Sequence, residues 1–270
     1  FSDRINETNW LRRIKVEPDL SAPLQHVWMS EFYMQTNLVT IEQWEAVRVW
    51  GKEHGYEDLP KGVGKAADHP VCWVSWNTII QWANAASEKD GLKPCYTLGG
   101  VIYRTGKSSA VECDWSANGY RLPTELEWEV AARGGLIGKR FPWGDTISHN
   151  EANYRGDNSY CTYDLSQDYH PKYASGQGPY TSPVGSFAPN RYGLYDMAGN
   201  VEQWCWDWYG DYETSPDTRG ASKGPFRVMR GGDWSSRGSD VRCAQRPPPQ
   251  IPGLVIVDDY FGFRLARSCR

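Results

Sequence analysis

The stretch GYRLPTELEWEVAARGG, from Gly119 to Gly135, carries the clearest local structure in this chain of 270 residues. Thr124, followed three residues later by Glu127, forms a capping box, in which two side chains satisfy backbone N–H groups of the first helical turn. A mainly apolar run from Trp128 to Ala132 follows, and Gly134 can adopt the left-handed conformation that commonly ends a helix. The stretch therefore predicts a helix between Thr124 and Gly134.

Two further helices and several short strands are predicted on either side of this stretch. Thr40-Ile-Glu-Gln43 is a second capping box, and its helix is expected to end at Gly55. A third helix is predicted from about Asn77 to Asp90. Strands are predicted at residues 71–74, 101–104, 226–230 and 262–266. The region from 135 to 225 is rich in Gly, Pro, Asn, Asp and Tyr, which indicates ordered loops packed by aromatic rings.

Composition is typical of a globular protein, with 40% apolar and 23% charged residues and a net charge of −4. This charge gives no reason to expect a nucleic-acid partner. No apolar run approaches the roughly 20 residues that a membrane span needs, and no signal peptide is visible at Phe1. No internal repeat or low-complexity linker divides the sequence, so residues 1–270 are predicted to form one domain.

The seven cysteines are scattered, with no CxxC pair, so they indicate neither a zinc site nor a disulfide framework. Scattered thiols are more typical of a reducing, cytoplasmic compartment. A display protein, by contrast, would be expected at a cell or virion surface.

The stretch from Gly119 to Gly135 resembles a signature of the formylglycine-generating (sulfatase-modifying) enzyme family. Further segments resemble that family in the same order along the chain: residues 69–76, 141–145, 152–154, 183–185, 192–201, 204–208, 230–232 and 262–264. The resemblance implies an α+β, C-type lectin-like fold with small sheets, few helices and much ordered loop.

The oxidases of this family depend on two copper-binding cysteines shortly after a Gly-Gly pair. By resemblance, those places fall at about Ser236 and Val241. Copper(I) selects soft thiolate ligands, so neither a hydroxyl nor an alkyl side chain is suitable. Cys243 lies nearby but matches a framework position. No copper and no formylglycine generation are expected, and an oxidase-like enzyme with altered chemistry is the alternative function.

A second branch of the family couples this fold to iron-dependent sulfoxide synthesis and resembles a chain with an additional His-rich helical domain. None of the five histidines here forms an i, i+4 pair, which argues against that branch.

A third branch consists of the variable proteins of diversity-generating retroelements, which display a hypervariable C-terminal segment. Residues 230–234, 241–246 and 262–265 resemble their framework, and the run from Ser235 to Phe261 contains no Lys, Glu, Met or Trp. Mutation at adenines in Asn-type codons cannot produce those four residue types. Gln245 and Gln250 depart from this pattern. The resulting hypothesis is a non-catalytic protein that binds a protein or other macromolecule through a variable segment, 235–260.

The proposed ligand-binding residues are the polar and apolar side chains of that segment. They are Ser235, Ser236, Arg237, Ser239, Asp240, Val241, Gln245, Gln250, Ile251, Leu254, Ile256, Asp258 and Tyr260. Prolines 247–249 restrict the backbone and lower the cost of presenting their neighbours. Residues 254–257 could form either an exposed apolar patch or a buried strand.

The resemblance also suggests structural calcium. The matching positions are Asn153, Asp196 and Gln203, where Gln203 replaces the family's usual Glu and Asp196 could restore the lost charge. Hard oxygen ligands of this kind suit calcium. The alternative is that these side chains only hydrogen-bond the backbone of neighbouring loops.

Overall fold

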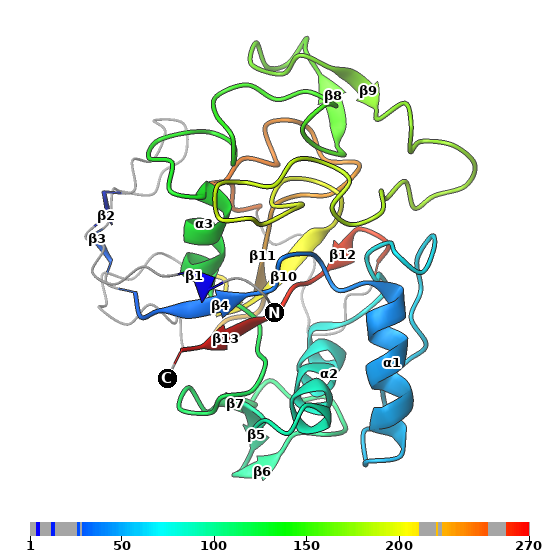
Figure 1. Cartoon of the computed structure of the whole chain (residues 1–270), viewed down its shortest axis with the longest axis vertical. Helices are drawn as coiled ribbons and strands as arrows, with labels where there is room; N and C mark the ends of the chain where they lie inside the picture. Colours follow the sequence, from blue (N-terminus) through cyan, green and yellow to red (C-terminus); the bar gives the residue numbers. More distant parts are fainter. Residues whose placement is uncertain are drawn as a thin grey trace.

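The computed structural model describes residues 29–210, 220, 223–247 and 258–269, and the backbone of residues 4–5, 12–13 and 26–27 (Figure 1). Its helices are α1 (Ile41–Lys52), α2 (Trp76–Lys89) and α3 (Glu125–Arg133). Within the described residues, none of these helices is long and apolar enough to cross a bilayer.

The helix starts follow the predicted caps, whereas α1 ends at Lys52, before the predicted stop at Gly55. Thr40 and Thr124 are N-caps with complete capping boxes, closed by Gln43 and Glu127. Helix α3 ends at Gly134, whose φ of 53° is left-handed, as predicted. Helix α2 starts one residue earlier than expected, because the Ser75 hydroxyl accepts the backbone N–H of Thr78.

Short strands supply the rest of the regular structure. They are β1 (Arg4–Ile5), β2 (Arg12–Arg13), β3 (His26–Val27), β4 (Phe32–Met34), β5 (Tyr96–Leu98), β6 (Val101–Ile102), β7 (Glu112–Cys113), β8 (Arg155–Asp157), β9 (Gln167–Tyr169), β10 (Glu202–Trp208), β11 (Arg227–Arg230), β12 (Phe261–Gly262) and β13 (Ala266–Ser268). They form three-stranded sheets in the orders β11–β10–β12, β1–β4–β13 and β6–β5–β7, and the pairs β2–β3 and β8–β9. The expected α+β class, with small sheets and few helices, is confirmed.

Strand β10 lies at the centre of the molecule and was not predicted. It pairs antiparallel with β11 and parallel with β12, so that Gln203 faces both Arg230 and Gly262 in register. Five of its seven residues are buried, including Glu202, Gln203 and Asp207. Buried polar residues remove the alternation of apolar and polar positions by which a half-buried strand is recognised in a sequence.

Two of the predicted strands need correction. Residues 71–74 form a single isolated bridge, between Val63 and Cys72, because Trp73 adopts a left-handed φ of 58° that interrupts extended backbone. The predicted strand at 262–266 is divided between β12 and β13. Residues 263–265 lie between these strands with wholly or almost wholly buried side chains.

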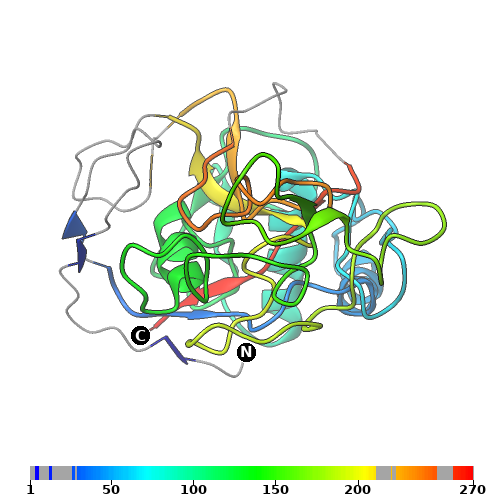
Figure 2. The same cartoon turned by 90° about the horizontal axis from the view of Figure 1, so that it is seen from above.

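The core lies on both sides of the central sheet. Helices α1 and α2 pack side by side, and α3 lies across β10 and β11 from them (Figures 1 and 2). Trp44 of α1 stacks on Trp82 of α2 at 5.5 Å, and Phe263 meets both rings edge-on. Trp128 of α3 is buried in the second part of the core. The sheet is thus held from two sides, and the described residues 231–247 and 258–260 adjoin it after β11 and before β12.

Candidate ligand-binding face

The segment after β11 begins with a turn that only glycine can form. Gly231 and Gly232 have φ values of 93° and 63°. A Cβ on Gly231 would lie 2.9 Å from the Trp128 ring, and a Cβ on Gly232 would lie 2.8 Å from Cγ1 of Val241. The Gly-Gly pair thus permits both the left-handed backbone and the close approach of neighbouring side chains.

Asp233 organises the residues that follow this turn. Its carboxylate accepts hydrogen bonds from the backbone N–H groups of Ser235, at 2.6 Å, and Ser236, at 3.0 Å. Both serine hydroxyls also donate to this carboxylate. Burial nevertheless raises the pKa of Asp233 above its ordinary value. Ser235 and Ser236 therefore belong to a hydrogen-bonded turn rather than to a loose loop.

Trp234 joins this turn to residues that are distant in sequence. Its ring lies 5.0 Å from that of Tyr180, 5.2 Å from that of Tyr260 and 5.9 Å from that of Tyr169. Its backbone N–H donates to the carbonyl of Asn200. Trp234 is 7% exposed. The aromatic group places the segment after β11 beside the segment before β12.

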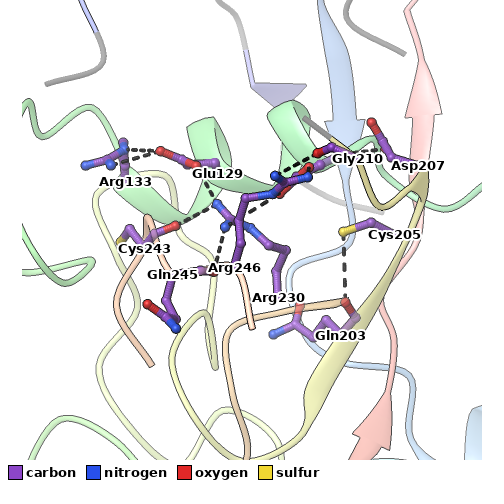
Figure 3. Close-up of polar contacts among 11 residues, drawn as sticks. Glu129, Arg133, Gln203, Cys205, Asp207, Gly210, Arg230, Cys243, Gln245 and Arg246 are labelled. Carbon is purple, nitrogen blue, oxygen red and sulfur yellow. Dashed lines mark hydrogen bonds and ion pairs between the residues drawn. The ribbon is translucent and has the colours of Figure 1, made fainter. Parts of the chain in front are cut away.

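Two arginines attach the same segment to helix α3 (Figure 3). Arg230 is fully buried, pairs with Glu129 and donates to the carbonyls of Cys243 and Gln245. Arg246 forms a two-pronged contact with Glu125, with nitrogen–oxygen distances of 2.6 and 3.0 Å. Because these contacts use the loop backbone and buried carboxylates, they fix the course of residues 230–246 without occupying its outward side chains.

Within the described part of the predicted face, most of the proposed side chains are accessible. Arg237 is exposed, and seven others are half-buried: Ser235, Ser236, Ser239, Asp240, Gln245, Asp258 and Tyr260. Val241 is a correction: its side chain is 0% exposed and packs among Phe141, Ile147 and Tyr154, so it cannot contact a ligand directly. Gln250, Ile251, Leu254 and Ile256 lie outside the described residues. The structure therefore does not test whether residues 254–257 form an exposed patch or a buried strand.

Ser236 and Val241, which match the family's copper-binding cysteines by resemblance, lie close together in space. A Cβ on Gly232 would lie 3.2 Å from Cβ of Ser236 and 2.8 Å from Cγ1 of Val241. The Ser236 hydroxyl is bonded to Asp233, and Val241 offers no lone pair. Cys243 is wholly buried, and burial raises the pKa of its thiol to about 12. These residues do not fit copper(I), which needs accessible thiolates.

The proposed calcium positions have hydrogen-bond partners of their own. The Gln203 amide oxygen accepts from Nε1 of Trp128 at 2.8 Å and from the Arg264 guanidinium at 2.7 Å, so a cation would meet a positive charge there. Gln203 is thus unsuited to calcium, and here the backbone-support alternative is favoured. The Asp196 carboxylate accepts the N–H of Gly185, and the Asn153 amide donates to the carbonyl of Tyr180. Calcium at these two positions stays a prediction.

Within the described residues, no group of three or more His, Cys, Asp or Glu side chains is arranged to hold a metal ion. A calcium site near Asp196 would therefore depend on amide and backbone oxygens.

Glu202 was missed by the sequence analysis, although its backbone pairs with the segment that enters β12. It begins β10, pairs in register with Phe261, and its backbone N–H donates to the carbonyl of Tyr260. Burial, with the nearby carboxylates of Asp233 and Asp240, raises its pKa to about 8. Sequence reasoning could have found it only if β10 had been recognised, because its position on the face depends on pairing with β12.

The comparisons with known proteins agree on one protein family. The family model described as Sulfatase-modifying factor enzyme 1-like domain matches residues 5–269. A formylglycine-generating enzyme of Thermomonospora curvata is 36% identical over 192 residues, which cover 66% of this chain and 50% of the enzyme. Serine/threonine-protein kinase Pkn1 of Chlamydia trachomatis serovar L2 is 38% identical over 258 residues, covering 92% of this chain but only 35% of the kinase.

Among solved structures, Treponema denticola variable protein 1 is similar over almost the whole length. The TM-score is 0.75 at 28% sequence identity, and the similarity covers 99% of this chain and 94% of that protein. The chain thus corresponds to a part of the kinase and of the enzyme, and to nearly all of the variable protein.

Proposed function

This chain belongs to the sulfatase-modifying factor enzyme 1-like domain family, and we propose that within this family it is a non-catalytic binding protein of the variable-protein type. Its ligand is a protein or another macromolecule. The contact surface is the face formed by residues 233–247 and 258–261; residues 248–257 of the proposed variable segment lie outside the described residues.

The observation that carries this proposal is the alternation of buried and accessible side chains along the face. Framework positions are buried: Trp234, Gly238, Val241 and Cys243. Between them, Ser235, Arg237, Ser239 and Gln245 are accessible to solvent. A segment in which fixed and accessible positions alternate can change its outward residues while keeping its course, as display of variable side chains requires.

The residues at the family's copper positions support binding over oxidation. A buried valine and a hydrogen-bonded serine offer no thiolate, so a copper-dependent oxidation has no ligands there. An oxidase-like enzyme with altered chemistry stays the alternative, and oxygen consumption in the presence of thiol peptides would favour it.

The likeness to Treponema denticola variable protein 1 supports the same choice, because it covers 99% of this chain. The composition of residues 235–261 adds to it, since Lys, Glu, Met and Trp, which adenine-directed mutation of Asn-type codons cannot produce, are absent. On this proposal the protein is displayed at a cell or virion surface. A near-copy of these codons, rich in adenine and beside a reverse transcriptase gene, is the expected genomic finding.

The direct test is a pair of libraries in the same segment. One randomises the accessible positions Ser235, Arg237, Ser239, Gln245 and Tyr260, and the matched control randomises Trp234, Gly238, Val241, Cys243 and Arg246. Most members of the first library should stay folded, and selection from it should yield binders to an arbitrary target such as lysozyme. Most members of the control library should not fold. Equal loss of folding in both libraries would overturn the proposal.

A further inference from the structure

Two histidines pack against each other beside strands β8 and β9. His170 directly follows β9 and is 9% exposed, and its Nε2 donates to the backbone carbonyl of His149 at 2.9 Å. The two imidazole rings are 5.0 Å apart. The Nε2 of His149 donates in turn to the carbonyl of Tyr154 at 3.2 Å. These two residues are called the histidine pair below.

The hydrogen bonds of His170 require a neutral ring. A carbonyl oxygen only accepts hydrogen bonds, so Nε2 must carry the proton that points to His149. Nδ1 accepts the backbone N–H of Lys172 at 3.2 Å, so this nitrogen must keep its lone pair. A proton on Nδ1 would oppose two N–H groups and break the bond from Lys172. The neutral ring with its proton on Nε2 is therefore the form that satisfies both partners.

The surroundings of the pair also disfavour a positive charge. The ring of His170 lies 4.6 Å from that of Tyr173 and 5.7 Å from that of Phe187. Burial lowers the pKa of both histidines below the ordinary 6.5. Lys172 adds a positive charge near His170, whereas Asp164 acts in the opposite sense on the other histidine. Further charged or titratable groups nearby are Lys65, on the carbonyl of Tyr173, and Tyr154 with Glu151, beside His149.

The histidine pair adjoins two contacts of the candidate face. One is the bridge that Arg155 of β8 makes with Arg237, in which the Arg155 N–H donates to the carbonyl of Ser236 at 2.9 Å. The other is the contact between the rings of Tyr169, in β9, and Trp234 at 5.9 Å. One histidine bonds the carbonyl of the residue before Arg155, and the other directly follows Tyr169. A change in the pair therefore acts on residues next to both contacts.

We propose that the histidine pair is an acid-sensitive support of the candidate face, which holds β8 and β9 against the face when both rings are neutral and releases them when a ring is protonated. The step is the uptake of a proton from water by a ring nitrogen. At His170 it breaks the bond from Lys172, and a charge on one ring opposes a second charge 5.0 Å away.

The direction of the pH dependence follows from the lowered pKa values. Once the segment opens, its histidines regain the ordinary pKa of 6.5 and take up protons that the closed pair refuses. The support is therefore complete above about pH 6.5 and is lost as the pH falls toward the lowered pKa values. Mild acidification is thus expected to loosen the face.

The inference goes beyond the proposed function, because it concerns the conformation of the face and is tested without a ligand. If the accessible-position library fails to fold while the pH response is present, the binding proposal alone fails. If the libraries behave as expected and the pH response is absent, this inference alone fails.

The test is hydrogen–deuterium exchange of the full chain at about pH 7.5 and about pH 5, on either side of the ordinary histidine pKa. Rates are corrected for the intrinsic pH dependence of exchange. The reporter is the backbone amide of Arg155, whose bond to Ser236 joins β8 to the face. The variant is the double substitution His149→Gln and His170→Gln, which removes both titrating rings and keeps a side-chain N–H donor at each position.

The matched control is His54→Gln, at an exposed histidine that follows α1. Three other groups with shifted pKa values, His69, Glu202 and Asp207, are kept in every protein, so their contributions cancel from the comparison.

The protection of the Arg155 amide should fall at least about tenfold between the two pH values in wild-type protein and in His54→Gln, because one unit of pKa difference is a tenfold change in the opening equilibrium. In the double variant it should change by less than about twofold. No fall in wild-type protein, or an equal fall in the double variant, would overturn the inference.

A measurement on wild-type protein alone keeps the inference testable if the double variant does not fold. Nitrogen-15 NMR of the imidazole rings should show His170 neutral and protonated on Nε2 at neutral pH. Its titration midpoint should lie below the ordinary 6.5 and coincide with the loss of protection at Arg155. A midpoint at or above 6.5, or a neutral ring protonated on Nδ1, would contradict the proposed support.

Discussion

Arg246 and Glu125 are 121 positions apart in sequence, and their side chains meet at the first turn of α3 with nitrogen–oxygen distances of 2.6 and 3.0 Å. Glu125 is 5% exposed and also faces Arg230 at 3.7 Å. Arg246 lies at the end of the described part of the candidate face, so this contact ties the loop to the helix that forms its support. The Arg246–Glu125 contact is charged, largely buried and made through two hydrogen bonds, so it is stronger than an ordinary surface ion pair.

Arg246→Ala should therefore destabilise the protein by about 3 kcal/mol, because it leaves the buried Glu125 carboxylate with one partner fewer. Urea denaturation measures this change. Arg246→Lys should recover part of the loss, since it restores charge but not the fork. Lys93→Ala, which removes an exposed pair with Asp114, is the control and should change stability by less than about 1 kcal/mol. Equal effects at Arg246 and Lys93 would contradict the supporting role.

Trp234→Ala should lower stability by about 3–5 kcal/mol, because it removes a ring that is 7% exposed and packs on three tyrosines. Thermal unfolding by circular dichroism provides the measurement. Leu165→Ala, at a side chain that is 63% exposed, should change stability by no more than about 0.5 kcal/mol. A tolerated Trp234→Ala variant would mean that this ring belongs to the ligand contact and not to the framework.

Stability should fall as pH rises through about 8, because of Asp207. Burial, with the charges of Glu125 and Glu127, raises the pKa of Asp207 to about 8 from its ordinary 3.8. Between these two values the folded protein holds a proton that the unfolded chain releases, so unfolding becomes easier with increasing pH. The contribution is complete below about pH 4 and is lost above pH 8.

Asp207→Asn should reduce this pH dependence, leaving the part that the raised pKa of Glu202 contributes, and stabilise the protein at pH 9 by on the order of 2 kcal/mol. The amide oxygen can still accept the backbone N–H of Glu125, which Asp207 now binds at 2.7 Å. Denaturant midpoints from pH 5 to pH 9 test the slope. A wild-type protein that gains stability across this range would show that the carboxyl group is ionised when folded.

No copper-dependent conversion of cysteine to formylglycine is expected. Ser236 is bonded to Asp233 and Val241 is buried, so the two thiolates that such a site needs are replaced. The protein is incubated with copper(I), oxygen and a sulfatase-type cysteine peptide, and the product is analysed by mass spectrometry beside the Thermomonospora curvata enzyme. An aldehyde product above the no-enzyme control would refute this expectation.

Calcium binding near Asp196 should raise the melting temperature, since a ligand that binds only the folded state stabilises it. Melting curves in chelator and in millimolar calcium measure the effect. Asp196→Asn should remove the calcium response while retaining the hydrogen bond from Gly185, because it deletes only the charge. An unchanged melting temperature in wild-type protein would leave Asp196 as a support for the loop backbone.

Local signals predicted the helices well and the central sheet poorly. The capping boxes at Thr40 and Thr124 are contained in four residues each, so a helix start can be recognised without any knowledge of the fold. Strand β10 gave no such signal, because Glu202, Gln203 and Asp207 are buried by tertiary contacts. Their burial depends on partners such as Trp128 and Arg264, which lie far away in the sequence.

The candidate face was predicted in outline but not in its details. Its frame, from Arg230 to Trp234 and from Gly262, was recognised by family resemblance. Val241 was included among the ligand-binding residues as a member of the candidate variable segment, yet it packs in the core. Glu202 was not considered, because only the parallel pairing of β10 with β12 brings it to the face.

The sequence by itself determined the helix ends, the Gly-Gly turn, the family and the absence of thiols at the two copper positions, since each depends on residue identity or short-range geometry. Tertiary structure alone decided which side chains of the face are accessible, and it paired Glu202 in register with Phe261. The physical reason is that burial and electrostatic neighbourhood arise from contacts between distant segments, and the chain order of those segments does not encode their spacing.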